Sequence, residues 1–345
     1  MGKNIKTVGI VSLSSGALGE EALRHELELG VSRLRGMGLQ VKFTDNALRG
    51  AQALKEHPEA RAADLLQAFR DEEIDLILCA IGGDDTYRLL PYLFEGDALQ
   101  KAVCQKPFLG FSDTTINHLM LHKVGVNTFY GQSFLSDICE LAPTMLPYTE
   151  RYFRELIETG TIREVTPADV WYESRGYYSA AELGKELVSH PNGGFELLQG
   201  APVFRGKILG GCLDSLFDLF DPGRYADSPV LAARYGLFPP LSDWRGRILL
   251  LETSEEKMTP AQYRHELETL KRTGVFGVVS GILAGKPMDE CCADEYRAIL
   301  TDVIADPALP VVWNVNIGHA MPRCILPFGV EATVDAAGQR ITFAV

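Results

Sequence analysis

The hydrophobic pattern of the first 130 residues alternates between two periods. Continuous apolar runs, typical of buried strands, are separated by segments with apolar residues at helical spacing. We predict strands at 7–13, 40–44, 74–81, 107–111 and 127–130, and helices at 20–34, 60–69, 86–93 and 114–124. This alternation predicts a doubly wound parallel sheet of the flavodoxin or Rossmann type.

The pattern changes after about residue 141. A helix is predicted at 149–158, and 161–201 is rich in glycine, tyrosine and polar residues, which predicts an irregular connector. Short strands follow at 207–209, 247–251, 277–283, 311–315 and 332–335, with helices at 212–220, 259–273 and 295–304. We therefore predict an N-terminal α/β domain at 1–150, a connector with an aromatic loop at 151–202, and a C-terminal α/β or α+β domain at 203–345.

Composition and charge narrow the classes of partner. The 345 residues include 33 Lys+Arg and 46 Asp+Glu, for a net charge of −13. An acidic chain is a poor match for nucleic acid polymers or anionic membranes, because phosphate contacts need a basic surface. No apolar run reaches the ~18 residues of a membrane helix, and the first residues lack a signal-peptide pattern. The seven cysteines form no CxxC pair, so we expect reduced thiols in a cytoplasmic protein.

Two polar segments directly follow predicted strands, where doubly wound sheets bind their ligands. The first begins with Gly82 and Gly83, which would let backbone amides approach a ligand or would simply form a tight turn. This segment, IGGDDT, is also similar to the GGDG motif of NAD kinases, although Asp85 stands where that motif has its last glycine. A phosphate-binding loop is therefore one hypothesis for it.

The second segment places Ser112 between a predicted strand and a predicted helix. Such a turn can expose a serine hydroxyl near helix N-terminal amides that would stabilise an oxyanion. The logic resembles a nucleophile elbow, but GFSDT lacks the last glycine of G-x-S-x-G. Helix capping is the alternative, and on these residues alone we favour it by roughly two to one.

Two further candidates follow strands of the second half. Glu252 ends the apolar run at 248–251, and His319 follows the run at 311–315. Each is also compatible with an ordinary structural position. His118 and His122 stand four residues apart on a predicted helix, but no third ligand is evident, so we expect no metal site.

Taken in order, the segments GG, GFSDTT, LLLETSEE and GHAMPRCILPFGV resemble the serine peptidases of the LD-carboxypeptidase and microcin C immunity protein family. The resemblance covers nearly the whole chain. It implies that Ser112 is the nucleophile, Glu252 and His319 complete the triad, and Gly83 with the amide of Asp113 forms the oxyanion hole. It implies no cofactor and a homodimer.

Details of the motifs favour the microcin C immunity branch, which implies a small peptide or aminoacyl-nucleotide substrate cleaved at an amide bond. The alternative is an LD-carboxypeptidase acting on murein tetrapeptides; a phosphotransferase or a non-enzymatic ligand-binding protein would belong to other classes. For substrate contacts we name Gly82, Trp171 as a surface for base stacking, and Cys212, which stands where the family's GGNL motif has asparagine.

Overall fold

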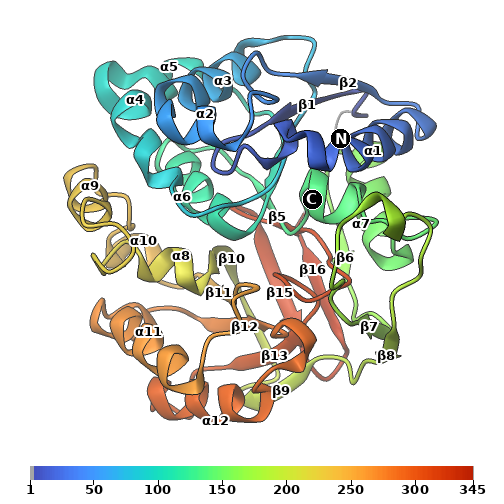
Figure 1. Cartoon of the computed structure of the whole chain (residues 1–345). Coiled ribbons are helices and arrows are strands. Elements are labelled where there is room, and N and C mark those ends of the chain that lie inside the picture. The colour runs from blue at the N-terminus through green and yellow to red at the C-terminus, as the bar shows by residue number, and fades with distance from the viewer. Residues whose placement is uncertain (1–3, 345) are drawn as a thin grey trace.

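The computed structural model describes residues 4–344. Figure 1 shows the two larger sheets, one in the blue-to-cyan N-terminal part at the top of the view and one in the yellow-to-red part below it. None of the helices that the structure describes combines the length and apolarity needed to cross a membrane.

The first sheet has the strand order β14-β5-β4-β3-β1-β2. Its strands are β1 (Thr7–Val11), β2 (Gln40–Phe43), β3 (Leu76–Cys79), β4 (Phe108–Gly110), β5 (Phe129–Tyr130) and β14 (Leu326–Pro327). The first five are parallel, and β1 and β3 are buried along their whole length. Continuous apolar runs form such strands because both faces of a parallel sheet are covered. The predicted doubly wound sheet is confirmed.

Seven α-helices accompany the first sheet, and each follows or precedes one of its strands. They are α1 (Arg24–Gly36), α2 (Ala51–Glu56), α3 (Pro58–Arg70), α4 (Leu90–Phe94), α5 (Ala98–Ala102), α6 (Thr115–Lys123) and α7 (Pro147–Thr159). Proline at the first position of α3 and α7 suits a helix start, because the first amides have no partner within the helix.

The second sheet is mixed, with the order β6-β16-β15-β10-β11-β12-β13-β9. Its strands are β6 (Glu164–Val165), β9 (Glu196–Gln199), β10 (Val203–Cys212), β11 (Ile248–Glu252), β12 (Gly281–Gly285), β13 (Val311–Val315), β15 (Glu331–Asp335) and β16 (Arg340–Phe343). The strands β10 to β13 are parallel, and the outer strands are antiparallel. Its helices are α8 (Leu213–Phe217), α9 (Ser228–Arg234), α10 (Leu241–Trp244), α11 (Pro260–Arg272) and α12 (Ala293–Ile304). The predicted α/β class is confirmed.

The prediction of an irregular connector at 161–201 is wrong in part. This segment contains β6 and β9 of the second sheet, and β7 (Val170–Tyr172) pairs with β8 (Ser189–Pro191) in a separate two-stranded sheet. The partners of β6 and β9 are β16 and β13, far along the chain, so local composition gives little sign of them. The hydrophobic pattern also did not predict the strand β16 or the short helices α2, α5, α9 and α10.

One strand links the two halves. The chain returns from the second sheet after β13, and β14 pairs antiparallel with β5, Leu326 opposite Tyr130. This crossing carries the loop at 316–325 across the carboxyl end of the first sheet. The domain boundaries at 150 and 202 stay a prediction.

Candidate active site

Ser112 lies in a strained turn between β4 and α6. The turn at Ser112–Thr114 is 3₁₀, and Ser112 has φ +65°, a left-handed conformation that costs a residue with a Cβ about 1–2 kcal/mol. The helix α6 starts at Thr115 without a side-chain cap. The capping interpretation of Ser112 is therefore wrong: its hydroxyl contacts a histidine instead.

The buried carboxylate of Asp113 holds this turn in place. It accepts hydrogen bonds from Ser14 Oγ at 2.7 Å, Thr86 Oγ1 at 2.6 Å and the Thr86 amide at 3.0 Å. These partners follow β1 and β3, so one side chain ties three strand ends together. The polar residues of the SDTT segment thus fix the backbone that carries Ser112.

Ser112, His319 and Glu252 form one hydrogen-bonded chain. The Nε2 atom of His319 lies 3.0 Å from Ser112 Oγ, and Nδ1 lies 2.8 Å from Glu252 Oε2. Glu252 is the last residue of β11, and its Oε1 atom accepts a 2.6 Å hydrogen bond from the hydroxyl of Tyr130. The three residues that the sequence singled out are thus brought together from both halves of the chain, within hydrogen-bonding distance.

A glycine permits the close approach of His319 to Glu252. Gly318 has φ +89°, and a Cβ there would fall 2.4 Å from Glu252 Oε2. The loop is also held by Arg323, whose guanidinium is buried. It donates to the carbonyls of Gly318 and His319 and to Asp137 at 2.9 Å. Sequence reasoning did not identify Arg323, although it lies inside the GHAMPRC segment.

The electrostatics of His319 favour the imidazolium form. Burial opposes a charge on the ring, but Glu252 and a second carboxylate, Glu255, outweigh it and raise the pKa of His319 to about 10. Glu255 Oε2 lies 3.0 Å from His319 Nε2. Its hydrogen bond with His319 outweighs partial burial and lowers the pKa of Glu255 to about 2. Glu255 was not among the residues that the sequence singled out.

A cavity of about 440 Å³ opens over Ser112 and His319. Its walls include Gly82, Gly83, Phe111, Glu26, Tyr178, Glu255, Met288 and Arg323. A Cβ at Gly82 would fall 2.7 Å from Ser112 Oγ and 3.1 Å from the Asp113 amide nitrogen. Gly82 therefore lies beside the hydroxyl, whereas a Cβ at Gly83 would meet Ser14 and Ser15 instead.

Trp171 and Cys212 lie outside the lining of this cavity. Trp171 packs between the ring of His190, at 4.5 Å, and the ammonium of Lys286, at 5.1 Å. The aromatic residue of the connector that lines the cavity is Tyr178. Cys212 is buried beside Glu252 and His319. Its backbone amide donates to Thr115 Oγ1 at 2.9 Å, and its thiol lies 3.6 Å from an Asp214 oxygen.

The loop after Gly83 is anchored by a buried ion pair. Asp85 is buried and pairs with Arg61, Oδ1 to Nη1 at 2.5 Å and Oδ2 to Nη2 at 3.2 Å. Arg61 also donates to the carbonyls of Leu13 and Ser14. The Asp85 carboxylate therefore faces Arg61 inside the protein and is not presented to a metal–phosphate complex.

Potential metal ligands lie together at one place in residues 4–344: the ligand atoms of Cys212, Glu252 and His319 are within 4.8 Å of one another. Glu252 and His319 already hydrogen-bond each other, and His319 also contacts Ser112. His118 is fully engaged elsewhere, by Thr128 at 2.7 Å and the Gly110 carbonyl at 3.1 Å, and burial lowers its pKa to about 4. The expectation of no metal stays a prediction.

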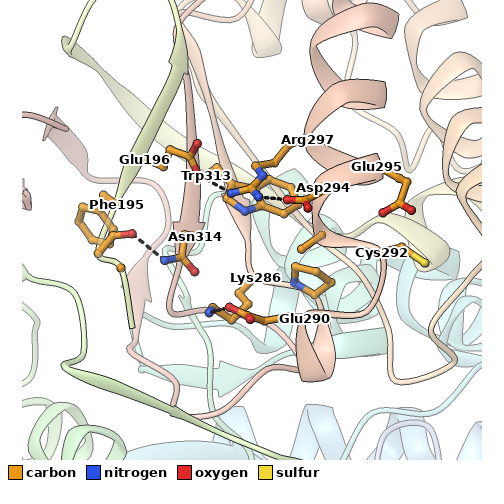
Figure 2. Close-up of a pocket in the computed structure, with 14 residues that line it drawn as sticks. Phe195, Glu196, Lys286, Glu290, Cys292, Asp294, Glu295, Arg297, Trp313 and Asn314 are labelled. Atoms are coloured by element: carbon orange, nitrogen blue, oxygen red, sulfur yellow. Dashed lines mark hydrogen bonds and ion pairs between the residues drawn. The ribbon is translucent and has the colours of Figure 1, made fainter. Parts of the chain in front are cut away.

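A second cavity, of about 520 Å³, lies on the second sheet and shares no lining residue with the first. Figure 2 shows its charged side chains paired with one another: Lys286 contacts Glu290, and Arg297 lies between Glu196 and Asp294. The side-chain Nδ2 of Asn314 donates to the Gly194 carbonyl at 2.6 Å. This cavity contributes no residue to the triad.

Comparison with known proteins places the chain among peptidases. The family model of the LD-carboxypeptidase N-terminal domain matches residues 8–131, and that of the C-terminal domain matches residues 205–334. Among curated proteins, the chain is 26% identical to "Probable murein peptide carboxypeptidase" of Bacillus subtilis, over 90% of this chain and 85% of the other. It is 26% identical to the microcin C7 self-immunity protein MccF of Escherichia coli, over 82% and 77%.

A solved structure covers the whole chain. The MccF-like protein of Streptococcus pneumoniae, in complex with AMP, is 60% identical over 99% of both chains, with a TM-score of 0.98. The fold and both family matches agree with the sequence resemblance. The chain belongs to the LD-carboxypeptidase family of serine peptidases, and it is a hydrolase of the carboxypeptidase type.

Proposed function

We propose that this enzyme cleaves an amide bond of a small peptide or aminoacyl-nucleotide substrate through a triad of Ser112, His319 and Glu252. The observation that carries the proposal is the continuous hydrogen-bonded chain from Ser112 Oγ through His319 to Glu252 at the wall of a cavity. A serine hydroxyl is a weak nucleophile until a base takes its proton, and a neutral His319 Nε2 is in place to do so.

In the proposed mechanism, Ser112 Oγ attacks the carbonyl carbon as its proton passes to His319 Nε2. Glu252 holds the ring through Nδ1 and stabilises the imidazolium that forms. Tyr130 fixes Glu252 in turn. His319 then protonates the leaving nitrogen, and water hydrolyses the acyl-enzyme with the same base.

For the oxyanion hole we propose the backbone amides of Gly83 and Asp113. The Asp113 amide nitrogen lies near the position that a Cβ on Gly82 would take, beside Ser112 Oγ. Amides at this point would donate to the negative charge that develops on the carbonyl oxygen. Removing one such donor typically costs about 10²–10³ in rate.

The ligands of the relatives and the residues lining the cavity support the proposed substrate class. Solved structures of MccF hold aspartyl sulfamoyl adenosine or glutamyl sulfamoyl guanosine, and the protein of Streptococcus pneumoniae holds AMP. By similarity we propose an aminoacyl-nucleotide substrate, with Tyr178, rather than Trp171, as the stacking surface for the base. Cleavage of murein tetrapeptides is the second candidate, since a curated relative is named for that substrate class. We also retain the homodimer and the cytoplasmic location as proposals.

The test is hydrolysis of aspartyl sulfamoyl adenosine and of a murein tetrapeptide by the native enzyme and by Ser112→Ala. We expect turnover of one of them and a loss of at least about 10³-fold in the variant. Labelling by a serine-directed phosphonate, followed by peptide mapping, should place the adduct on Ser112. Undiminished turnover by Ser112→Ala, or an adduct elsewhere, would contradict the proposal.

A further inference from the structure

His319 Nε2 has two competing neighbours. Ser112 Oγ and Glu255 Oε2 both lie 3.0 Å from it. A ring nitrogen carries at most one proton, and it either donates that proton or accepts through its lone pair. The nitrogen that must accept the proton of Ser112 is therefore also in contact with a carboxylate.

The position of Glu255 is compatible with only one protonation state of the ring. In the catalytic tautomer, Nδ1–H donates to Glu252 and the lone pair of Nε2 faces outward, so a carboxylate 3.0 Å away would be repelled. In the imidazolium, Nε2–H donates to Glu255. Three titratable side chains lie close to the ring: Glu252 from β11, Glu255 from the loop after β11, and Cys212 at the end of β10. Tyr130 of β5 acts on the ring indirectly, through its hydrogen bond to Glu252, and Arg323 donates to the His319 carbonyl.

The two carboxylates on His319 differ in their freedom to move. The side chain of Glu252 is 0% exposed and is fixed by the Tyr130 hydroxyl. The side chain of Glu255 is 63% exposed, and His319 is its one ion-pair partner in residues 4–344. Glu252 is therefore a fixed part of the triad, whereas Glu255 can leave the ring by rotation of its side chain.

The walls of the cavity offer no cation to receive Glu255. Arg323 is the one Lys or Arg side chain that lines the described cavity, and it is already bound to Asp137 and to three carbonyls. Nearby, Lys257 pairs with Asp289. Arg224 is close enough to contribute to the lowered pKa of Glu255, but its guanidinium already pairs with Glu256, at 3.1 Å, and Asp218, at 3.7 Å. A second acid, Glu26, also lines the cavity. A cation that draws Glu255 away would thus have to arrive with the substrate.

We propose that Glu255 holds His319 in a protonated state that cannot accept the proton of Ser112, and that the ammonium group of an aminoacyl substrate releases it by pairing with Glu255. This inference rests on the proposed function. An α-ammonium nitrogen lies two bonds, or about 2.5 Å, from the carbonyl carbon that Ser112 attacks. Because Ser112 and Glu255 contact the same nitrogen, a substrate seated on Ser112 presents its ammonium within reach of Glu255.

The proton balance of this step is simple. When Glu255 turns from His319 to the substrate ammonium, the imidazolium loses one of its two stabilising carboxylates and gives its Nε2 proton to water. The ring is then neutral, with Nδ1–H on Glu252, and accepts the proton of Ser112. Glu255 is thus a positioning residue that also selects substrates with a cation beside the scissile carbonyl.

The first test needs no turnover. In protein labelled at histidine, in the Ser112→Ala background, NMR titration should show the pKa of His319 falling by about 1–3 pH units when Glu255→Gln removes the carboxylate. The matched control is Glu256→Gln, whose side chain is similarly exposed and pairs with Arg224. An unchanged His319 titration in Glu255→Gln would overturn the inference, whatever the substrate of the enzyme.

The second test compares aspartyl sulfamoyl adenosine with its N-acetyl derivative. The native enzyme should have a kcat/KM at least about tenfold higher for the free amine than for the N-acetyl derivative. This ratio corresponds to the free energy of one charge-assisted hydrogen bond. In Glu255→Gln this preference should shrink to about threefold or less, and the acidic limb of the pH profile should move to lower pH. A preference retained by Glu255→Gln, while Ser112→Ala is inactive, would contradict this inference and leave the triad intact. Activity in Ser112→Ala would instead contradict the proposed function.

Discussion

His319 Nε2 lies 3.0 Å from Ser112 Oγ, although 207 positions separate the two residues in the chain. Ser112 is held on the first sheet by Asp113, and His319 follows β13 of the second sheet. The return of the chain through β14 to β5 carries the histidine loop over the serine. The contact between these two atoms therefore depends on the packing of one sheet against the other.

Gly82 should be intolerant of even a methyl group. An alanine Cβ would fall 2.6 Å from Ser112 Cβ and 2.7 Å from its Oγ, so Gly82→Ala should displace the hydroxyl and lower kcat/KM by about 10² or more. The control is Gly36→Ala, where a Cβ meets nothing within 4 Å. It should keep full activity and gain about 0.5–1 kcal/mol of stability, because the position is helical. Equal activities of the two variants would contradict the assigned geometry.

Glu252→Gln should keep the shape of the site but remove the charge that stabilises the imidazolium. We expect kcat/KM to fall by about 10²–10⁴ at neutral pH. Tyr130→Phe removes the hydrogen bond to Oε1 and the longer contacts of the same hydroxyl with the Ser112 amide, at 3.2 Å, and Thr115 Oγ1, at 3.3 Å. Since the Glu252 charge remains, it should cost about tenfold or less. Steady-state kinetics of both variants on one substrate show which of them loses more of its kcat/KM. A larger loss in Tyr130→Phe than in Glu252→Gln would argue against Glu252 as the acid of the triad.

Tyr178 and Trp171 can be compared directly as base-stacking surfaces. Tyr178→Ala should remove the free energy of stacking one base on an aromatic ring, about 1–3 kcal/mol. This loss would raise the Kd for AMP by roughly 5- to 150-fold. Trp171→Phe should change Kd by less than about threefold, because Trp171 packs against His190 and Lys286 outside the cavity. Isothermal titration calorimetry measures both values. The reverse order would restore Trp171 as the stacking residue.

Glu26 makes stability depend on pH. Burial and the nearby Glu140 carboxylate raise its pKa from 4.5 to about 7, and its Oε1 atom is buried without a hydrogen bond to any residue in 4–344. A raised pKa means that the folded state binds the proton more tightly, so this contribution is present below pH 4.5 and is lost as the pH rises through about 7. Glu26→Gln should therefore be more stable than native protein at pH 8, by roughly 1–3 kcal/mol, and not at pH 4.5.

Urea unfolding at the two pH values checks this expectation. Glu28→Gln is the control, since Glu28 is exposed on the same helix and pairs with Arg24 on the surface. It should change stability by less than about 0.5 kcal/mol at either pH. An equal response of the two variants would mean that Glu26 is not the group responsible.

Breaking the buried ion pair of Arg61 and Asp85 should lower the free energy of unfolding strongly. Arg61→Met leaves the Asp85 carboxylate buried with only Arg88, at 3.3 Å, as a partner, and should cost up to about 3–5 kcal/mol of unfolding free energy. Arg24→Met removes an exposed pair with Glu21 and should cost less than about 1 kcal/mol. Denaturant unfolding of the two variants tests the contrast, and similar midpoints would refute a structural role for Asp85.

Much of the fold could be predicted because its strands are locally distinctive. The runs that form β1, β3 and β13 are continuous and apolar, as burial on both faces requires. The short strands β6 and β9 were missed, since their partners lie far along the chain and they are only two and four residues of mixed polarity. Glu255 and Arg323 were missed for a related reason: nothing in the spacing of either residue marks its contact with His319.

The sequence by itself determined the parallel first sheet and the family, and it singled out the three residues that we propose as a triad, because apolar periodicity and motif order are local properties. Only the tertiary structure decided that Ser112 faces His319 rather than capping a helix, that Tyr178 rather than Trp171 lines the cavity, and that a second carboxylate contacts the His319 imidazole. These outcomes depend on how β14 and the loop after β11 approach the first sheet. Such contacts are set by the packing of distant segments, which no local pattern encodes.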